Sequence, residues 1–226
     1  GLRSLAPQAD GDLYIVGARG GISHLYQGQW HAKPNATAMV NHVLKTPSDE
    51  TWLALEGQGV VYREFDSAPD TAILENLSAY RLIEDNAGII WVATSNGLYQ
   101  INNKTARLIT PDSGLPQSPI YTLYLTRQGE LIVGSEQGAW KQVNNRFISI
   151  HAQLKNEAIS SILQDDHDDL WFGTINKGVF RLSPLGLEQL DADAGLPANR
   201  ILSLLQDREN SIWVGTNGGL YRLREA

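Results

Sequence analysis

Residues 207–223 read DRENSIWVGTNGGLYRL, and this stretch recurs along the chain. The clearest further copies are DDHDDLWFGTINKGVFRL at residues 165–182 and DNAGIIWVATSNGLYQI at residues 85–101. Weaker copies contain LIVGS, TWLA and LYIVG, at residues 131–135, 51–54 and 13–17. Fixed-period self-similarity of this kind indicates a repeat architecture, which has to be recognised before any single residue is interpreted.

A small residue follows the apolar triplet of each copy, and it marks the repeat length. The six small residues are Gly17, Ala54, Ala93, Gly134, Gly173 and Gly215. Successive members are 37, 39, 41, 39 and 42 residues apart. A period near 40 residues is typical of the four-stranded blade of a β-propeller. Short β-branched and aromatic runs bounded by Gly, Asn and Asp also predict strands.

The sequence therefore predicts an all-β fold, a β-propeller of four-stranded antiparallel blades, with six repeats visible. We expect one propeller domain or segment over residues 1–226. Its blade repeats are expected at roughly 1–35, 36–76, 77–116, 117–156, 157–198 and 199–226. The last repeat lacks a sequence for an outer strand, so the six repeats are expected to belong to a larger ring.

Turn residues recur in the same register as the strands. Residues that tolerate a positive φ angle stand three positions before each Trp position: Gly11, Asp49, Gly88, Gly129, Asp168 and Asn210. The next turn ends in glycine in all six copies: Gly21, Gly59, Gly97, Gly138, Gly178 and Gly219. A side chain at these glycines is expected to clash or to strain the backbone, so we interpret them as structural.

Four tryptophans share one repeat position and could suggest a stacking platform for a ligand. They are Trp52, Trp91, Trp171 and Trp213. A large side chain repeated at one blade position is expected to pack between neighbouring blades, where it buries a large apolar area. We therefore predict that these residues belong to the core.

The signature D-x-x-G-x-x-W-[V/I/F]-G-T followed by G-G-L-Y-R-L resembles the two-component regulator propeller repeat. Gly114-Leu115-Pro116 and Gly195-Leu196-Pro197, each just before a predicted inner strand, also fit that family. Three copies depart from the signature, since Gln8, Thr46 and Thr126 replace the acidic residue and Ile132 replaces the aromatic one. The resemblance nevertheless runs along essentially the whole chain.

The resemblance implies an extracytoplasmic, periplasmic sensor domain of a bacterial signalling protein. Such domains precede a membrane helix and a histidine kinase or diguanylate cyclase output module, so a membrane link is expected only through a segment outside this chain. The resemblance also implies a ring of about seven blades and a homodimer in the parent protein. These implications rest on family analogy, which is a weaker basis for function than a site.

Composition limits the classes of partner. The net charge is −7 and the basic residues are scattered, whereas a nucleic-acid site needs clustered Lys and Arg to replace counterions. We therefore expect no nucleic-acid partner. The chain has no cysteine, which excludes disulfides and thiolate metal sites.

Motifs for catalysis or cofactors are not recognisable, and we expect no enzyme activity, cofactor or metal. Residues 134–138 lack the spacing of a G-x-S-x-G elbow, and residues 17–21 form neither a P-loop nor a dinucleotide fingerprint. The five histidines follow no metal-ligand spacing. The cluster Asp165–Asp169 could supply oxygens to a hard cation, but it coincides with a turn, and we favour the turn.

The candidate binding face consists of the loops that join the second to the third strand (B–C turns) and the fourth strand to the next blade (D–A loops). These positions differ most among the six copies, as expected where a scaffold carries a site. The B–C candidates are Arg19, Glu56, Asn96, Glu136, Asn176, Lys177 and Asn217. The D–A candidates are Asn35, Gln117, Asn156 and Arg200. This mixture of amides, acids and bases suits a hydroxyl-rich or zwitterionic small molecule, such as a carbohydrate or another polar metabolite.

Two functions from different classes follow. A sensor domain would bind a small-molecule ligand and pass the signal to an output module. A protein–protein docking platform would use a propeller face or an open blade edge instead. A propeller lyase or hydrolase is a third alternative, with less support from the sequence.

Overall fold

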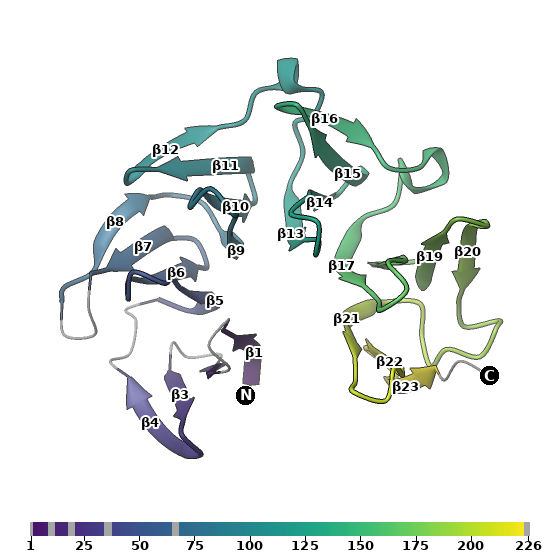
Figure 1. The fold of residues 1–226 in the computed structure, drawn as a ribbon, viewed down its shortest axis with the longest axis horizontal. Helices are drawn as coiled ribbons and strands as arrows, with labels where there is room; N and C mark the ends of the chain where they lie inside the picture. Colours follow the sequence, from purple (N-terminus) through teal and green to yellow (C-terminus); the bar gives the residue numbers. More distant parts are fainter. Residues whose placement is uncertain (1, 9–11, 18–20, 34–37, 65–67, 224–226) are drawn as a thin grey trace. The chain divides into compact units, whose positions relative to one another are not determined.

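The computed structural model describes residues 2–8, 12–17, 21–33, 38–64 and 68–223, and these residues form consecutive antiparallel sheets (Figure 1). Five sheets have four strands each, and the last described sheet has three. In every sheet the strands follow one another in sequence order, which is the meander of a propeller blade. The prediction of an all-β propeller with six blade repeats is therefore confirmed.

The chain divides into two compact units, Gly1–Ile109 and Thr110–Ala226, each with three blades. Blade 1 contains β1 (Leu2–Pro7), β2 (Leu13–Gly17), β3 (Ile22–Tyr26) and β4 (Gln29–Lys33). Blade 2 contains β5 (Val40–Lys45), β6 (Thr51–Leu55), β7 (Gly59–Arg63) and β8 (Thr71–Leu74). Blade 3 contains β9 (Ala79–Glu84), β10 (Ile90–Thr94), β11 (Gly97–Asn102) and β12 (Thr105–Leu108).

The second unit repeats this plan. Blade 4 contains β13 (Ile120–Leu125), β14 (Leu131–Ser135), β15 (Gly138–Val143) and β16 (Arg146–Ser149). Blade 5 contains β17 (Ile159–Gln164), β18 (Leu170–Thr174), β19 (Val179–Ser183) and β20 (Gly186–Leu190). Blade 6 contains β21 (Ile201–Gln206), β22 (Ile212–Thr216) and β23 (Gly219–Leu223). Two short 3-10 helices, η1 (Pro111–Ser113) and η2 (Ala152–Leu154), lie in D–A loops. No helix in the described residues has the length and apolar character needed to cross a bilayer.

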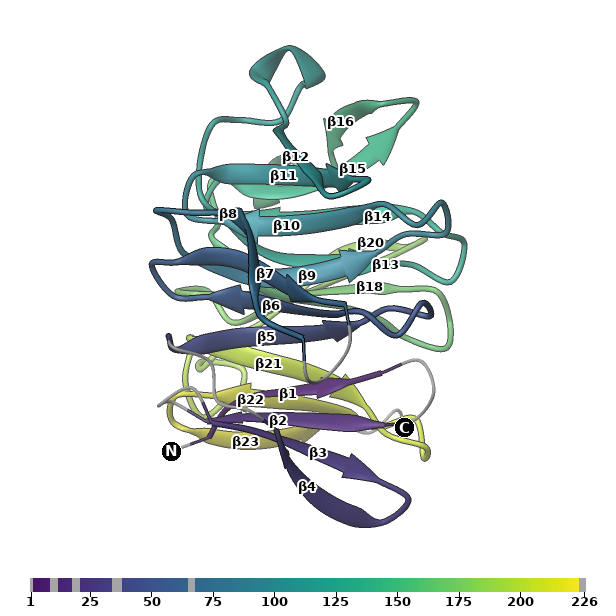
Figure 2. The same ribbon diagram turned by 90° about the vertical axis from the view of Figure 1, so that its left-hand side faces the viewer.

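Neighbouring blades within each unit pack through their first, inner strands. In the first unit β5 contacts both β1 and β9. Figure 2 shows β5 and β9 with their arrows pointing the same way. In the second unit β17 contacts β13 and β21 in the same way. Apolar side chains of two adjacent blades therefore share each core layer, as in the cluster that joins Trp52 of blade 2 to Leu82 of blade 3.

The small residue that marks the repeat has a packing role. A Cβ atom on Gly173 would lie 2.5 Å from Cγ2 of Ile201, which begins the next inner strand. A Cβ atom on Gly134 would lie 2.9 Å from Cγ2 of Ile159 for the same reason. The small residue thus lets a β-branched side chain of the following blade approach the sheet closely.

The predicted turn geometry is present. Of the six positions before the Trp strand, Gly11 lies outside the described residues. The other five have positive φ: Asp49, Gly88, Gly129, Asp168 and Asn210. Glycines at the end of the next turn also have positive φ at Gly59, Gly97, Gly138, Gly178 and Gly219. A side chain on Gly178 would meet the Leu190 carbonyl oxygen at 2.2 Å.

The acidic residue of the repeat signature holds the turn and the tryptophan together. Asp85 accepts hydrogen bonds at Oδ1 from the backbone N–H groups of Ala87 and Ile89, at 2.9 and 3.0 Å. Its Oδ2 atom accepts one from Trp91 Nε1 at 2.8 Å. Asp165 and Asp207 make the same three contacts in blades 5 and 6.

The tryptophan prediction is confirmed for three residues, because Trp52, Trp91 and Trp171 are buried. Trp213 is only half-buried, so the prediction of a core position is wrong in degree there. Blade 6 is the last described blade of the second unit, and no further blade of that unit follows it among the described residues.

Candidate functional site

The hydroxyl residue that ends the second strand organises each B–C turn. Thr94 donates its hydroxyl hydrogen to the Gly97 carbonyl at 2.7 Å, and its oxygen accepts from the Asn96 backbone N–H at 3.1 Å. Ser135, Thr174 and Thr216 make the same pair of bonds in blades 4, 5 and 6. The turn tip is therefore held rigidly while its side chains remain variable.

Backbone hydrogen bonds bring the B–C turns and the D–A loops to the same edge within each unit. The Gly59 N–H donates to the Leu77 carbonyl at 2.7 Å in the first unit. In the second unit Gly138 donates to Glu157 at 2.9 Å, and Gly178 to Asn199 at 2.8 Å. The two loop sets that the sequence predicts to share a face are thus hydrogen-bonded to each other.

The predicted binding residues divide between the two units. In the first unit Glu56 is half-buried and Asn96 is exposed, whereas Arg19 and Asn35 lie outside the described residues. The remaining candidates belong to the second unit and are exposed: Glu136, Asn176, Lys177, Asn217, Gln117, Asn156 and Arg200. Half-burial distinguishes Glu56 from the other described candidates.

Glu56 lies at the centre of a polar cluster between blades 2 and 3. Its Oε2 atom accepts a hydrogen bond from Asn41 Nδ2 at 2.9 Å, and Oε1 accepts one from the Ser78 hydroxyl at 3.0 Å. Asn41 also donates to the Ala79 carbonyl at 2.8 Å, which fixes its amide. A strand, a B–C turn and a D–A loop therefore converge on one carboxylate.

Tyr80 belongs to the same cluster, which we call the Glu56 cluster: Asn41, Glu56, Ser78 and Tyr80. Partial burial and the negative charge of Glu56 raise the pKa of the Tyr80 phenol, while a hydrogen bond with Ser78 opposes that shift. The phenol therefore remains a neutral donor and acceptor at physiological pH. Together the four side chains offer amide, carboxylate, hydroxyl and phenol groups to a polar ligand.

Three members of this cluster, Asn41, Ser78 and Tyr80, were not predicted from the sequence. Asn41 and Tyr80 each stand second in an inner strand, where every described blade has a β-bulge that leaves one residue without a ladder partner. The bulged residues are Arg3, Asn41, Tyr80, Tyr121, Ser160 and Leu202. Bulges re-aim side chains next to functional sites, and the variability of this position was the signal that could have identified it.

In the second unit several predicted residues already have protein partners. Lys177 Nζ lies 2.7 Å from Glu157 Oε1, which belongs to the D–A loop before blade 5. The Asn217 backbone N–H donates to the Arg200 carbonyl at 3.2 Å, so these two residues are neighbours. This part of the predicted face is built mainly from exposed side chains.

Three pockets in the described residues lie away from the predicted side chains. The largest, about 650 Å³, lies on the inner strands of the first unit and includes His42, Lys45, Arg81 and Glu84. A second of about 400 Å³ lies between blades 2 and 3 beside Lys104. A third of about 380 Å³ lies between blades 5 and 6. None of the candidate ligand-binding residues that the structure describes lines any of these three pockets.

Two histidines that could have suggested catalysis serve the fold. The His24 ring stacks on Tyr14 at 4.4 Å, and its Nε2 atom lies 2.7 Å from Asp12 Oδ2. His42 is buried, and its Nδ1 atom accepts a hydrogen bond from the Leu82 backbone N–H at 3.4 Å. Burial and the nearby positive charge lower the pKa of His42 well below 6.5, so its ring is neutral.

The acidic cluster in blade 5 is built as a turn. Oxygen or nitrogen atoms of Asp165, Asp166 and His167 approach within 4.8 Å of one another, which is close enough to surround a cation. However, both oxygens of Asp165 already accept hydrogen bonds from the turn and from Trp171. This geometry favours the turn interpretation over a metal site.

Family comparison identifies the repeat. Residues 153–176 and 195–218 match the family model described as two component regulator propeller. Each match runs from a D–A loop through the inner strand to the B–C turn, in blades 5 and 6. The resemblance predicted from the repeat signature is thereby confirmed. No curated protein matches the chain.

Solved structures share the fold at low identity. The extracellular domain of BT4673 from B. thetaiotaomicron, described as a one component system, has a TM-score of 0.79 and 21% identity over 99% of this chain. The chain spans 33% of that domain. Virginiamycin B lyase from Staphylococcus aureus has a TM-score of 0.78 and 15% identity, covering 100% of this chain and 81% of the lyase. The WD40 propeller domain of Doa1 has a TM-score of 0.73 and 14% identity, covering 98% and 77%. At such identities these likenesses establish the propeller fold alone.

Proposed function

Because this chain carries repeats of the two-component regulator propeller type, we propose that it is an extracytoplasmic ligand-sensing domain of a bacterial signal-transduction protein. The parent protein would carry a histidine kinase or diguanylate cyclase output, and the domain itself would recognise a ligand without transforming it. The similar BT4673 domain is extracellular and is described as part of a one component system, which supports an extracytoplasmic, signalling role here.

The observation that carries the proposal is the convergence of polar groups in the Glu56 cluster. Its members come from an inner strand, a B–C turn and a D–A loop, which is how propellers assemble sites from variable loops on a rigid scaffold. A carboxylate flanked by an amide, a hydroxyl and a phenol matches the alternating donors and acceptors of a sugar or an amino acid. We therefore assign the ligand class as small and hydroxyl-rich or zwitterionic.

We also propose that the domain binds its ligand without catalysing a reaction on it. Glu56 is hydrogen-bonded to an amide and a hydroxyl, and the rings of His24 and His42 are used in packing. General acid–base catalysis needs a titrating group within hydrogen-bond reach of the reacting proton, with a base or nucleophile beside it. The Glu56 cluster presents groups that bind and orient.

A thermal unfolding screen against monosaccharides, disaccharides and amino acids tests this function. A ligand that binds only the folded state stabilises it by about 2.7 kcal/mol at 100 times its Kd, so we expect a clear rise in Tm for at least one compound. Glu56→Gln should remove most of that rise in Tm. The amide has one acceptor oxygen, so it cannot accept hydrogen bonds from both Asn41 and Ser78 and also bind the ligand.

Glu136→Gln is the matched control, since Glu136 occupies the same repeat position in blade 4 and is exposed. We expect it to leave the ligand-induced rise unchanged. If both variants lose the ligand-induced rise in Tm equally, recognition belongs to the B–C turns in general. If neither variant loses it, the Glu56 cluster does not bind the ligand.

A protein–protein docking platform is the second candidate, and exposed leucines in blade 6 favour it. Leu220 is 65% exposed, whereas Val60 and Leu98 at the same repeat position are 0% exposed. Leu202 and Leu205 on the inner strand of that blade are also exposed. An apolar surface of this kind is typical of an interaction site. This function predicts that no compound of the screen raises the Tm.

A further inference from the structure

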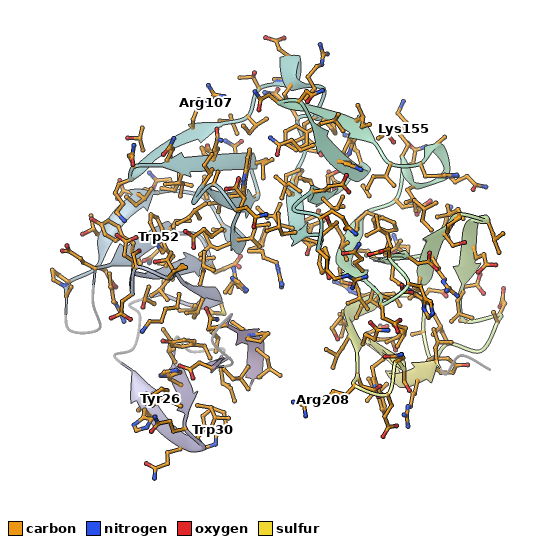
Figure 3. The ribbon with its side chains drawn as sticks, in the orientation of Figure 1. Tyr26, Trp30, Trp52, Arg107, Lys155 and Arg208 are labelled. Atoms are coloured by element: carbon orange, nitrogen blue, oxygen red, sulfur yellow. The ribbon has the colours of Figure 1, made fainter. Side chains whose placement is uncertain are left out.

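The pocket of about 400 Å³ beside Lys104 lies at the other edge of the first unit, among A–B and C–D turns rather than B–C turns. It is lined by Ser48 and Glu50 before β6, by Trp52, by Glu84 at the end of β9, and by Lys104. Figure 3 marks Trp52 among the strands of blade 2, and β11 and β12 join at Lys104. Two blades therefore contribute to the pocket, and both belong to the same unit.

An aromatic pair contacts the Lys104 ammonium group, and one ring of the pair, Trp52, lines this pocket. Lys104 Nζ lies 4.9 Å from the Trp52 ring centroid and 4.4 Å from the Tyr62 centroid, and the two rings stack 5.1 Å apart. Its ammonium group also forms an ion pair with Glu50. Two aromatic faces and a carboxylate around one ammonium group are the elements of a cation-recognition site.

Blades 5 and 6 fill the equivalent place with a cation from their own third strand, whereas Gln100 stands opposite Trp91 in blade 3. Arg181 lies over Trp171 in blade 5 and pairs with Asp169 at 2.7 Å. Arg222 lies over Trp213 in blade 6 in the same manner. These arginines stand directly opposite the tryptophan in the strand register, and they are fixed by the sheet.

Blade 2 differs from blades 5 and 6 because Tyr62 stands opposite Trp52. The strand therefore supplies a second aromatic ring in place of a cation, and the positive charge comes from Lys104 on a hairpin turn of the next blade. The Lys104 side chain is 37% exposed and reaches the rings through a flexible chain of methylene groups. It is therefore held less firmly than an arginine on a strand.

The pocket lining has a negative net charge, which favours the binding of another cation. Glu50 and Glu84 contribute two negative charges and Lys104 one positive charge, so the lining has a net charge of −1. Burial is the main cause that raises the pKa of Glu84, and the negative charges of Asp85 and Glu50 add to it.

We propose that this pocket binds the ammonium group of a small organic cation, which takes the place over Trp52 and Tyr62 that Lys104 occupies. Lys104 acts as a tethered competitor, and Glu50 and Glu84 supply the counter-charge. This site is separate from the Glu56 cluster, because it lies at the opposite strand ends, and it goes beyond the sensing function proposed above.

Titration of the purified chain with n-butylammonium, followed by NMR shifts and calorimetry, tests the proposal. Lys104→Gln removes the competing charge, and we expect it to bind n-butylammonium about 10-fold more tightly than the original chain does. Neutral n-butanol should show no comparable binding in either protein. Adding Tyr62→Leu to Lys104→Gln should weaken binding by about 5-fold or more, because one aromatic face is lost.

Controls separate recognition from a purely structural contact. Lys155→Gln removes an exposed lysine in the second unit and should leave the affinity of the original chain unchanged. Equal binding of n-butanol and n-butylammonium, or no gain in affinity in a Lys104→Gln protein whose NMR spectrum remains that of a folded chain, would overturn the proposal. Glu56→Gln should not alter n-butylammonium binding, so failure here is distinguishable from failure of the proposed sensor site.

Discussion

At the scale of single residues, His42 shows how burial couples charge to stability. The side chain stands third in β5, packed in the interface with β9, where its Nδ1 atom accepts from the Leu82 N–H. Burial is the main reason that the pKa of His42 is lowered, and the positive charge of Arg81 adds to it. The folded state therefore holds this ring neutral at pH values at which the unfolded chain would protonate it.

We predict that the chain loses stability as the pH falls below about 6.5, because His42 then binds a proton in the unfolded state and not in the folded state. Each pH unit below that value should cost about 1.4 kcal/mol, until the folded-state pKa is reached. Urea unfolding at pH 7.5, 6.5 and 5.5 measures this. His42→Gln should flatten the dependence, whereas His31→Gln, at an exposed residue of β4, should not. Parallel curves for the original chain and His42→Gln would contradict the assignment.

At the scale of elements, the B–C turn of blade 2 contains two glycines with the same handedness and different surroundings. Gly57 has a φ of 68° and open space where a Cβ atom would lie, whereas Gly59 has a φ of 76° and the Leu74 carbonyl oxygen 2.2 Å from that position. Left-handed backbone strain is therefore common to both positions. Steric conflict with the neighbouring strand is specific to Gly59.

We predict that Gly57→Ala costs about 1 kcal/mol, the strain of a left-handed alanine. Gly59→Ala should cost at least about 3 kcal/mol, because the backbone of β8 must also move. Chemical denaturation of both variants under the same conditions gives the comparison. Equal losses of unfolding free energy in the two variants would mean that the recurrent glycine is required only for its positive φ angle and not for the close approach of the strands.

The same turns show what a sequence can reveal about elements and where it stops. The period of small residues and the glycine register predicted the strands and turns, because backbone geometry imposes those residue types locally. The recurrent aspartate was predicted only as part of a family signature, since its bond to the tryptophan indole six residues later depends on the folded turn. Asn41 and Tyr80 were missed because a bulge, not a residue type, directs them to the Glu56 cluster.

At the scale of the whole molecule, the blade repeat provides a scaffold with two different edges. In the first unit one edge carries the Glu56 cluster, and the other carries the Lys104 pocket. The sequence predicted the first edge as the binding face from loop variability, and Glu56 is the predicted residue that the structure places in a cluster. It did not predict the second edge, because Lys104 and Trp52 are 52 residues apart and meet only when two blades pack. A ring of about seven blades stays a prediction.

Recognition without turnover at the Glu56 cluster is tested most directly by ligand-observed NMR. The chain is mixed with the sugars and amino acids of the thermal screen, and saturation transfer and compound integrity are followed over several hours. We predict that at least one compound receives saturation, remains chemically unchanged, and loses the effect in Glu56→Gln. Consumption of a bound compound, or saturation transfer that Glu56→Gln leaves intact, would contradict the account.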